Sequence, residues 1–145
     1  VIAGHKNAIL QGIEMAKSKG AKRAIMLPMS IPSHCSLMKP AADSMRQQLA
    51  HVTLQPPRIP ILHNADVKTH ADAADIKEIL IRQLTSPVRW VDTIKALAAN
   101  GITHVVECGP GKVLAGLNKR IDPSLQQLSL ADGEAIKQAI NHLRT

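Results

Sequence analysis

His34 stands where the sequence changes from an extended segment to a helix. Pro32 disfavours helical backbone in the residue before it, so the chain is expected to be extended up to that point. Ser33 or Ser36 is suited to cap the helix that follows, and Pro40 fits a first helical turn. From these residues alone, the commoner interpretation is a partly buried imidazole that hydrogen-bonds a neighbouring carbonyl. The alternative is a general base that faces a cleft.

The sequence contains no G-x-S-x-G nucleophile elbow that would supply a serine partner for His34. Ser33 and Cys35 adjoin the histidine, but adjacent side chains seldom point at each other. The residues therefore indicate a candidate base without an evident nucleophile.

A glycine-containing turn is predicted at residues 107–112, between a strand and a helix. It is not a Walker A loop, because Val113 follows Lys112 and the glycine spacing is wrong. Backbone N–H groups at such a turn are able to face an anion. A purely structural turn is the more frequent alternative.

Neither a metal nor a cofactor is expected. The seven histidines are scattered, and His63, Asp66 and His70 lack the fixed spacing of a zinc site. The two cysteines, Cys35 and Cys108, are far apart, which is typical of free thiols in a reducing cytoplasm.

The composition indicates one domain with an aliphatic core. The 145 residues are 45% apolar, with one Trp and neither Phe nor Tyr. The net charge of +7 leaves an anionic small molecule or an acidic protein open as a partner. Nucleic acid is disfavoured, because stacking needs aromatic rings and no dense basic run is present. No apolar run is long enough to span a membrane and no signal peptide is recognised, so a cytoplasmic protein is expected.

Hydrophobic periodicity predicts alternating strands and helices, above all from residue 59 onward, and hence a parallel sheet covered by helices. Strands are expected at 1–4, 21–28, 59–64, 102–107 and 125–130. Helices are expected at 6–19, from the His34 corner to about 52, and at 75–84, 88–100, 112–121 and from 132 onward. Because the sequence opens inside a strand pattern, we expect a fragment of a longer protein.

Three segments resemble motifs of bacterial malonyl-CoA–acyl carrier protein transacylases. Ser30–Ala42 is similar to the histidine motif of that family, and Glu107–Leu117 is similar to its E-x-G-P-G-K-V-L-x-G-L signature. Between them, Arg82–Leu84 and Pro87–Trp90 resemble the Q-L…P-V-x-W segment. The resemblance covers the whole chain but only about the C-terminal half of the family's sequence.

The resemblance implies an α/β fold, with part of an α/β hydrolase-like parallel-sheet core and the tail of a small ferredoxin-like subdomain. Residues 1–30 would be the remnant of the ferredoxin-like subdomain. Residues 31–145 would be the C-terminal half of the acyltransferase core.

The activity that the resemblance implies is ping-pong malonyl transfer from CoA to acyl carrier protein through a serine ester, in fatty acid biosynthesis. His34 matches the general base of the family. Gln83 matches the residue whose backbone carbonyl orients that histidine, so its side chain should be replaceable.

Binding roles are implied for four further residues. Lys22 and Arg23 match basic positions near the cleft mouth, expected to meet CoA phosphates or acidic acyl carrier protein. Ser33 falls where related acyltransferases vary with the acyl group, and Asn64 is expected to support the cleft. The expected partners are malonyl-CoA, acyl carrier protein and the missing N-terminal half, without nucleic acid or membrane.

The serine motif, the malonyl-binding arginine and the oxyanion-hole donors of the family are absent from this sequence. The chain alone is therefore expected to be inactive. Two alternatives remain: a non-catalytic docking module that binds acyl carrier protein through Lys22, Arg23 and Lys112, or a thioester hydrolase on the same core.

Overall fold

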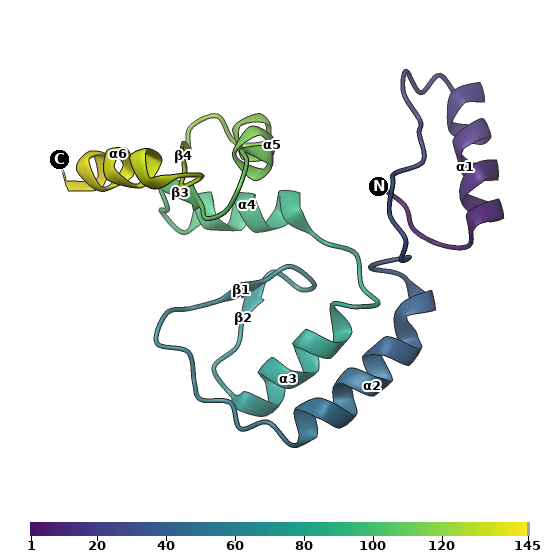
Figure 1. Cartoon of the computed structure of the whole chain (residues 1–145), viewed down its shortest axis with the longest axis horizontal. Helices are drawn as coiled ribbons and strands as arrows, with labels where there is room; N and C mark the ends of the chain where they lie inside the picture. Colours follow the sequence, from purple (N-terminus) through teal and green to yellow (C-terminus); the bar gives the residue numbers. More distant parts are fainter. Residues whose placement is uncertain (145) are drawn as a thin grey trace. The chain divides into compact units, whose positions relative to one another are not determined.

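The computed structural model describes residues 1–144, which form helices and four short strands (Figure 1). In chain order the elements are α1 (Lys6–Ser18), the single-turn 3-10 helix η1 (Ser36–Met38), α2 (Lys39–Ala50), β1 (Leu62–His63), β2 (Lys68–Thr69), α3 (Ala73–Arg82), α4 (Trp90–Ala99), β3 (His104–Glu107), α5 (Val113–Ile121), β4 (Gln126–Ser129) and α6 (Gly133–Arg144). The chain forms two compact units, Val1–Val88 and a second that begins at Arg89. The subdomain boundary expected near residue 30 concerns a longer fold and stays a prediction.

Helices α2 and α3 pack on each other in the first unit. A buried alanine, Ala42, lets the two backbones approach, and α3 buries Ile76 and Ile79. The Asp72 side chain caps α3 by accepting hydrogen bonds from two backbone N–H groups, at 2.8 and 3.3 Å. The predicted helix at 75–84 is confirmed, with its start shifted by two residues because Asp72 provides the cap.

The strands predicted at 1–4 and 21–28 are wrong, since neither segment belongs to a strand in the part of the chain described. A strand needs a neighbour that pairs with its N–H and C=O groups, and apolar pattern alone does not supply one. The predicted helix between these segments is confirmed as α1. It ends before Gly20, whose φ of +88° is a left-handed conformation that favours glycine.

The predicted strand at 59–64 is shorter than expected. Only Leu62–His63 pairs, antiparallel to Lys68–Thr69, with Leu62 opposite Thr69. Pro60 lacks an N–H group, which limits pairing at that end. The second strand of this hairpin lies between the strand predicted at 59–64 and the helix predicted at 75–84, where no strand was expected.

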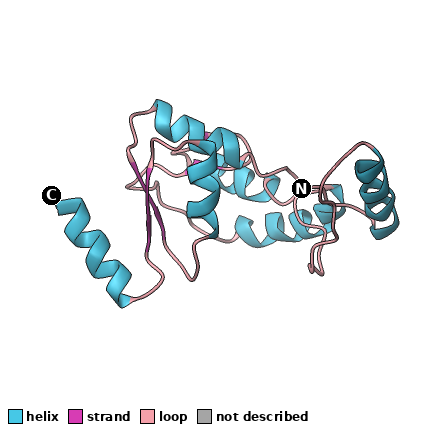
Figure 2. Ribbon diagram, turned by 90° about the horizontal axis from the view of Figure 1, so that it is seen from above, coloured by secondary structure: helices cyan, strands magenta, loops and turns pink. Residues whose placement is uncertain are grey.

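In the second unit β3 and β4 pair in parallel, as predicted (Figure 2), and their register sets His104 opposite Gln126. Helix α5 makes the crossover between them and packs on both strands. The side chains buried in this unit are Thr93, Ile94, Asn118, Leu125 and Ala139. The predicted α/β character and the parallel pairing are confirmed, and the parallel sheet consists of these two strands.

Buried polar groups tie α4, α5 and β4 together. Trp90 Nε1 donates to Asn118 Oδ1 at 2.9 Å, and Asn118 Nδ2 donates to Gln127 Oε1 at 3.1 Å. Asn118 is 1% exposed, so these bonds satisfy an amide that would otherwise be costly to bury.

Among the residues described, no helix has the length and apolar character needed to cross a membrane.

Candidate active site

His34 has a left-handed backbone conformation, with φ of +63°. This region is uncommon for residues other than glycine and costs on the order of 1–2 kcal/mol. The turn is held on its C-terminal side, where Met38 N donates to Cys35 O at 3.0 Å. The Cys35 thiol donates to Pro32 O at 3.2 Å. Strained residues of this kind are concentrated at functional sites.

The imidazole of His34 lies 3.0 Å, through Nδ1, from the backbone oxygen of Gln83. A carbonyl oxygen only accepts, so Nδ1 carries the proton in this contact and Nε2 keeps its lone pair in the neutral ring. The His34 side chain is exposed, which leaves Nε2 accessible. The two residues are 49 positions apart in the sequence, and the α2–α3 pair brings them together. This arrangement suits a general base with a defined tautomer.

The Gln83 carbonyl is available because it stands at the end of a helix. Gln83 caps α3, and its own N–H donates to Ile79 O at 3.0 Å. The next two N–H groups, of Leu84 and Thr85, turn back to the carbonyls of Ile81 and Arg82. The last carbonyls of a helix lack intrahelical donors, and here one of them accepts the imidazole proton.

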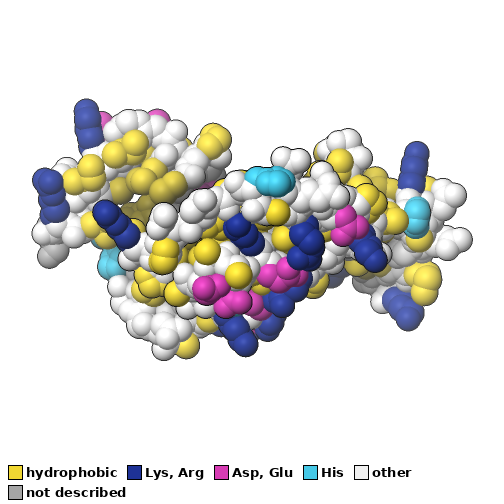
Figure 3. Space-filling model, turned by 90° about the horizontal axis from the view of Figure 1, so that it is seen from below, with side chains coloured by type: hydrophobic (Ala, Val, Ile, Leu, Met, Phe, Trp, Pro, Cys, Tyr) yellow, Lys and Arg dark blue, Asp and Glu magenta, His cyan; other side chains and the backbone are white. Residues whose placement is uncertain are grey.

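A groove of about 1050 Å³ runs beside His34 within the first unit. Apolar side chains of α1 and of the segment that follows it supply most of the lining, among them Ile9, Ile13, Ile25 and Leu27. His34, Ser33 and Arg23 also line the groove, so three of the residues singled out by the sequence share one surface. Lys22 and Asn64 lie outside its lining residues. The lysine and arginine side chains are spread over the face seen in Figure 3, with acidic groups among them.

Glu107 occupies the N-terminus of α5 in the second unit. Its carboxylate accepts from Leu114 N at 3.2 Å and from Ala115 N at 2.8 Å. Two of the backbone donors that an anion would use at this helix start are therefore already bonded. Gly111 has φ of +101°, and its carbonyl accepts from the Ser129 hydroxyl at 2.9 Å. The structural interpretation of the glycine turn is the one that this geometry supports.

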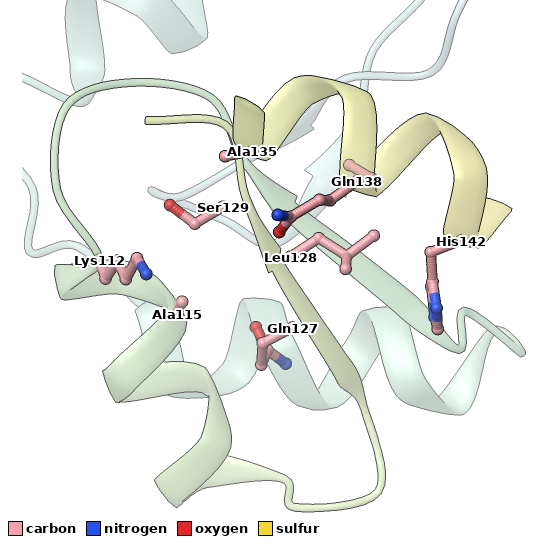
Figure 4. Close-up of a pocket in the computed structure, with 9 residues that line it drawn as sticks. Lys112, Ala115, Gln127, Leu128, Ser129, Ala135, Gln138 and His142 are labelled. Carbon is pink, nitrogen blue, oxygen red and sulfur yellow. The ribbon is translucent and has the colours of Figure 1, made fainter. Parts of the chain in front are cut away.

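A second hollow, of about 390 Å³, lies between α5, β4 and α6 (Figure 4). Its polar lining residues include Lys112, Gln127, Ser129, Gln138 and His142. Ser129 donates its proton to a backbone carbonyl, while His142 Nε2 lies 2.8 Å from the side-chain oxygen of Gln126. Serine and histidine thus have separate partners and do not form a nucleophile–base pair here.

Asp66, Lys68 and His70, in and beside the β1–β2 hairpin, form a polar cluster with Arg82 at the end of α3. Asp66 Oδ2 lies 2.9 Å from His70 Nε2 and 3.1 Å from Arg82 Nη2. Burial by itself raises the pKa of Asp66. The hydrogen bonds from His70 and from Lys68 N–H, with the charges of His70 and Arg82, outweigh this and lower that pKa overall.

Sequence reasoning did not predict these contacts of Asp66. It weighed His63, Asp66 and His70 only as metal ligands, and within residues 1–144 no group of three or more His, Cys, Asp or Glu side chains is placed to hold a metal. The sequence offered one signal for a connection to the site: Arg82 immediately precedes Gln83, the expected partner of His34.

No family model matches the chain, but comparison with known proteins finds curated relatives. The Salmonella typhimurium malonyl CoA-acyl carrier protein transacylase is 48% identical over 140 residues, which are 97% of this chain and 45% of that protein. The Bacillus subtilis protein of the same name is 42% identical over 144 residues, 99% of this chain and 45% of that protein. Over nearly its whole length the chain is similar to malonyl CoA-acyl carrier protein transacylases. It spans about half the length of the curated relatives that it matches, as the motifs predicted.

Solved structures show the same similarity. The transacylase from Coxiella burnetii matches with a TM-score of 0.94 and 46% identity, covering 98% of this chain and 45% of that one. A malonyl-transacylase in complex with a type II PKS acyl carrier protein matches with a TM-score of 0.94 and 40% identity, covering 96% of this chain and 45% of that one. The fold of this half is therefore that of the transacylases.

Proposed function

We propose that this chain is the histidine-bearing half of a malonyl-CoA–acyl carrier protein transacylase, an acyltransferase of fatty acid biosynthesis. The observation that carries the proposal is the hydrogen bond between His34 Nδ1 and the Gln83 carbonyl, at 3.0 Å, beside a groove. Relatives that are 42–48% identical over nearly the whole chain bear the name of this activity. We place the enzyme in the cytoplasm, in keeping with its two free cysteines.

In the proposed reaction, His34 Nε2 takes the hydroxyl proton of a serine supplied by the other half. The serine oxygen attacks the thioester carbonyl of malonyl-CoA, the C–S bond breaks, and the leaving CoA thiolate receives the proton from the imidazolium. In the second step Nε2 takes the proton of the carrier's phosphopantetheine thiol. The sulfur attacks the acyl-serine ester, the C–O bond breaks, and the serine oxygen recovers the proton.

Gln83 contributes its carbonyl to the proposed mechanism. It holds the Nδ1 proton and favours the imidazolium that forms during each transfer, as a triad carboxylate does in proteases. A backbone acceptor carries only a partial charge, but it is fixed by the helix end and needs no side-chain ordering.

Substrate binding is proposed at the groove. Arg23 lines it together with His34 and is exposed, so it is suited to meet the phosphates of CoA or an acidic carrier surface. Lys22 adds charge next to it in the sequence. Ser33 lines the same groove, and we propose that it contacts the acyl group. Asn64 is proposed only to support the cleft. The transacylase relative in complex with a carrier protein supports acyl carrier protein as the partner class.

The test is complementation in trans. The chain is co-expressed with the N-terminal half of the Salmonella typhimurium relative, and malonyl transfer to acyl carrier protein is measured. We expect transfer that depends on both halves, and a loss of about 1000-fold or more with His34→Ala. His51→Ala, at an exposed histidine after α2, is the matched control and should retain activity.

Two outcomes would overturn the proposal. Inactivity of a well-folded complex of the two halves is one, and activity that survives His34→Ala is the other. Hydrolysis of malonyl-CoA that exceeds transfer to the carrier thiol would instead assign a thioester hydrolase.

A further inference from the structure

The carboxylate of Asp66 connects the β1–β2 hairpin to the end of α3, where Gln83, the partner of His34, lies. Oδ2 contacts both His70 Nε2, at 2.9 Å, and Arg82 Nη2, at 3.1 Å. Oδ1 accepts from Lys68 N at 3.2 Å. Both oxygens are therefore engaged, and the side chain is only 15% exposed.

Arg82 is the last residue of α3, and the next residue is Gln83, whose carbonyl accepts the proton from His34. An ion pair on Arg82 thus restrains the turn of helix that aims this carbonyl. Helix ends fray when nothing holds them, and a carbonyl that moves by an ångström no longer orients an imidazole.

The hairpin that carries Asp66 is itself well defined. Val67 has φ of +60°, and its N–H donates to His63 O at 2.9 Å, which closes the turn. The buried ring of His63 lies edge-on to His70, with centroids 5.5 Å apart. His70 is thereby packed on one side and bonded to Asp66 on the other.

The physical setting makes this carboxylate more effective than a surface ion pair. Exposed pairs contribute little because water and salt screen them. In the pair described here the Asp66 side chain is 15% exposed and that of Arg82 49%, whereas both members of the Arg46–Glu78 pair between α2 and α3 are exposed, at 55% and 57%. The hydrogen bonds and charges around Asp66 keep its pKa below the ordinary value, so the carboxylate is ionised at neutral pH.

We propose that Asp66 is a positioning residue for the catalytic histidine, acting through Arg82 on the Gln83 carbonyl and so on the tautomer of His34. Only the catalytic consequence of this proposal rests on the proposed function; the effect on the His34 tautomer does not. It assigns a task in the reaction to a hairpin whose residues do not contact the imidazole in the bonds described.

The test observes His34 directly, by ¹⁵N NMR of histidine side chains in the full chain at pH 8. In the unmodified chain, His34 should be mainly the Nδ1–H tautomer, with Nε2 unprotonated. Asp66→Asn should move the ring toward a tautomer mixture and broaden its signals. Glu14→Gln, which removes an exposed carboxylate paired with Lys17 on α1, is the matched control and should leave His34 unchanged.

Arg82→Gln tests the same connection from the other side, in case Asp66→Asn does not fold. Arg82 is about half exposed, so this change is expected to be tolerated. Arg82→Gln should shift the His34 tautomer in the same direction as Asp66→Asn. Arg82→Lys keeps the charge and should therefore give a smaller shift. If every folded variant of Asp66 or Arg82 retains the His34 tautomer of the unmodified chain, the proposal is overturned.

Kinetics of the complemented enzyme separate this proposal from the proposed function. Asp66→Asn should lower kcat by about 10- to 100-fold with little change in KM, because binding contacts are unaltered. If the unmodified complex shows no transfer, the proposed function fails, and the NMR result still decides whether Asp66 positions His34.

Discussion

At the scale of single residues, His34 is oriented by a backbone oxygen at 3.0 Å where many catalytic histidines use a carboxylate. Such a partner cannot be deleted by truncating a side chain. It is lost only when the backbone that carries it moves. Substitutions at position 83 therefore distinguish backbone from side-chain function.

Gln83→Ala should preserve the His34 tautomer and keep transfer by the complemented enzyme within about threefold, since the carbonyl remains. Gln83→Pro should abolish both the tautomer preference of His34 and the transfer activity. It removes the hydrogen bond from the residue 83 N–H to Ile79 O and disfavours helical backbone at Arg82, at a cost of about 3 kcal/mol. NMR of the His34 ring and a transfer assay check the pair. A large loss with Gln83→Ala would show that the side chain matters.

The left-handed backbone at His34 predicts an inverted stability order. A variant with alanine is usually more stable than one with glycine at the same position, but at φ of +63° a residue with a Cβ has a strained backbone. His34→Gly should therefore be more stable than His34→Ala by about 1 kcal/mol in denaturant unfolding. The exposed helical site Ala8 is the control: Ala8→Gly should be destabilising by roughly the same amount. Equal stability of the two His34 variants would contradict the strained conformation.

At the scale of elements, the Glu107 carboxylate organises the strand–turn–helix of the second unit. It accepts two N–H groups at the start of α5, so it acts as a cap supplied by the preceding strand. The charge also interacts favourably with the helix dipole. The glycine signature is in this respect a structural device.

Glu107→Ala should lower the free energy of unfolding by about 1–2 kcal/mol, the usual cost of losing a helix cap. Glu107→Gln should lose less, because an amide oxygen still accepts one bond. Urea unfolding measures both, with Glu134→Gln on α6 as the control, since Glu134 contacts only a glutamine side chain in the bonds described. No change with Glu107→Ala would show that water replaces the cap at no cost.

At the scale of the whole molecule, acid stability should depend on the buried His63. Its side chain is 8% exposed, and its Nε2 has no hydrogen-bond partner among the residues described. Burial lowers the pKa of His63 below the ordinary 6.5, the charge of His70 lowers it further, and Asp66 opposes the shift. The unfolded chain therefore binds a proton more readily than the folded chain.

As pH falls below about 6.5, the unfolded state takes up this proton first, and folding stability should decline until the lowered pKa is passed. The slope from one group is at most about 1.4 kcal/mol per pH unit. His63→Leu should flatten the curve between pH 7 and 5, measured by thermal unfolding. His51→Gln, at an exposed histidine, should leave it unchanged. A curve that keeps its slope in His63→Leu would assign the acid sensitivity to other groups.

The sequence by itself determined most of the helices and the parallel pair, because helical periodicity, caps and breakers act within a few residues. Its motifs also indicated the resemblance to the transacylases, and with it the expectation that His34 contacts the Gln83 carbonyl. It did not determine which apolar segments pair: the strands expected at 1–4 and 21–28 do not form, since pairing depends on distant backbone. Only the tertiary structure placed the Asp66 carboxylate against Arg82 and the Glu107 carboxylate on α5. The partner of Asp66 is a side chain 16 residues away and those of Glu107 are backbone N–H groups 7 and 8 residues away, and both depend on how the elements pack.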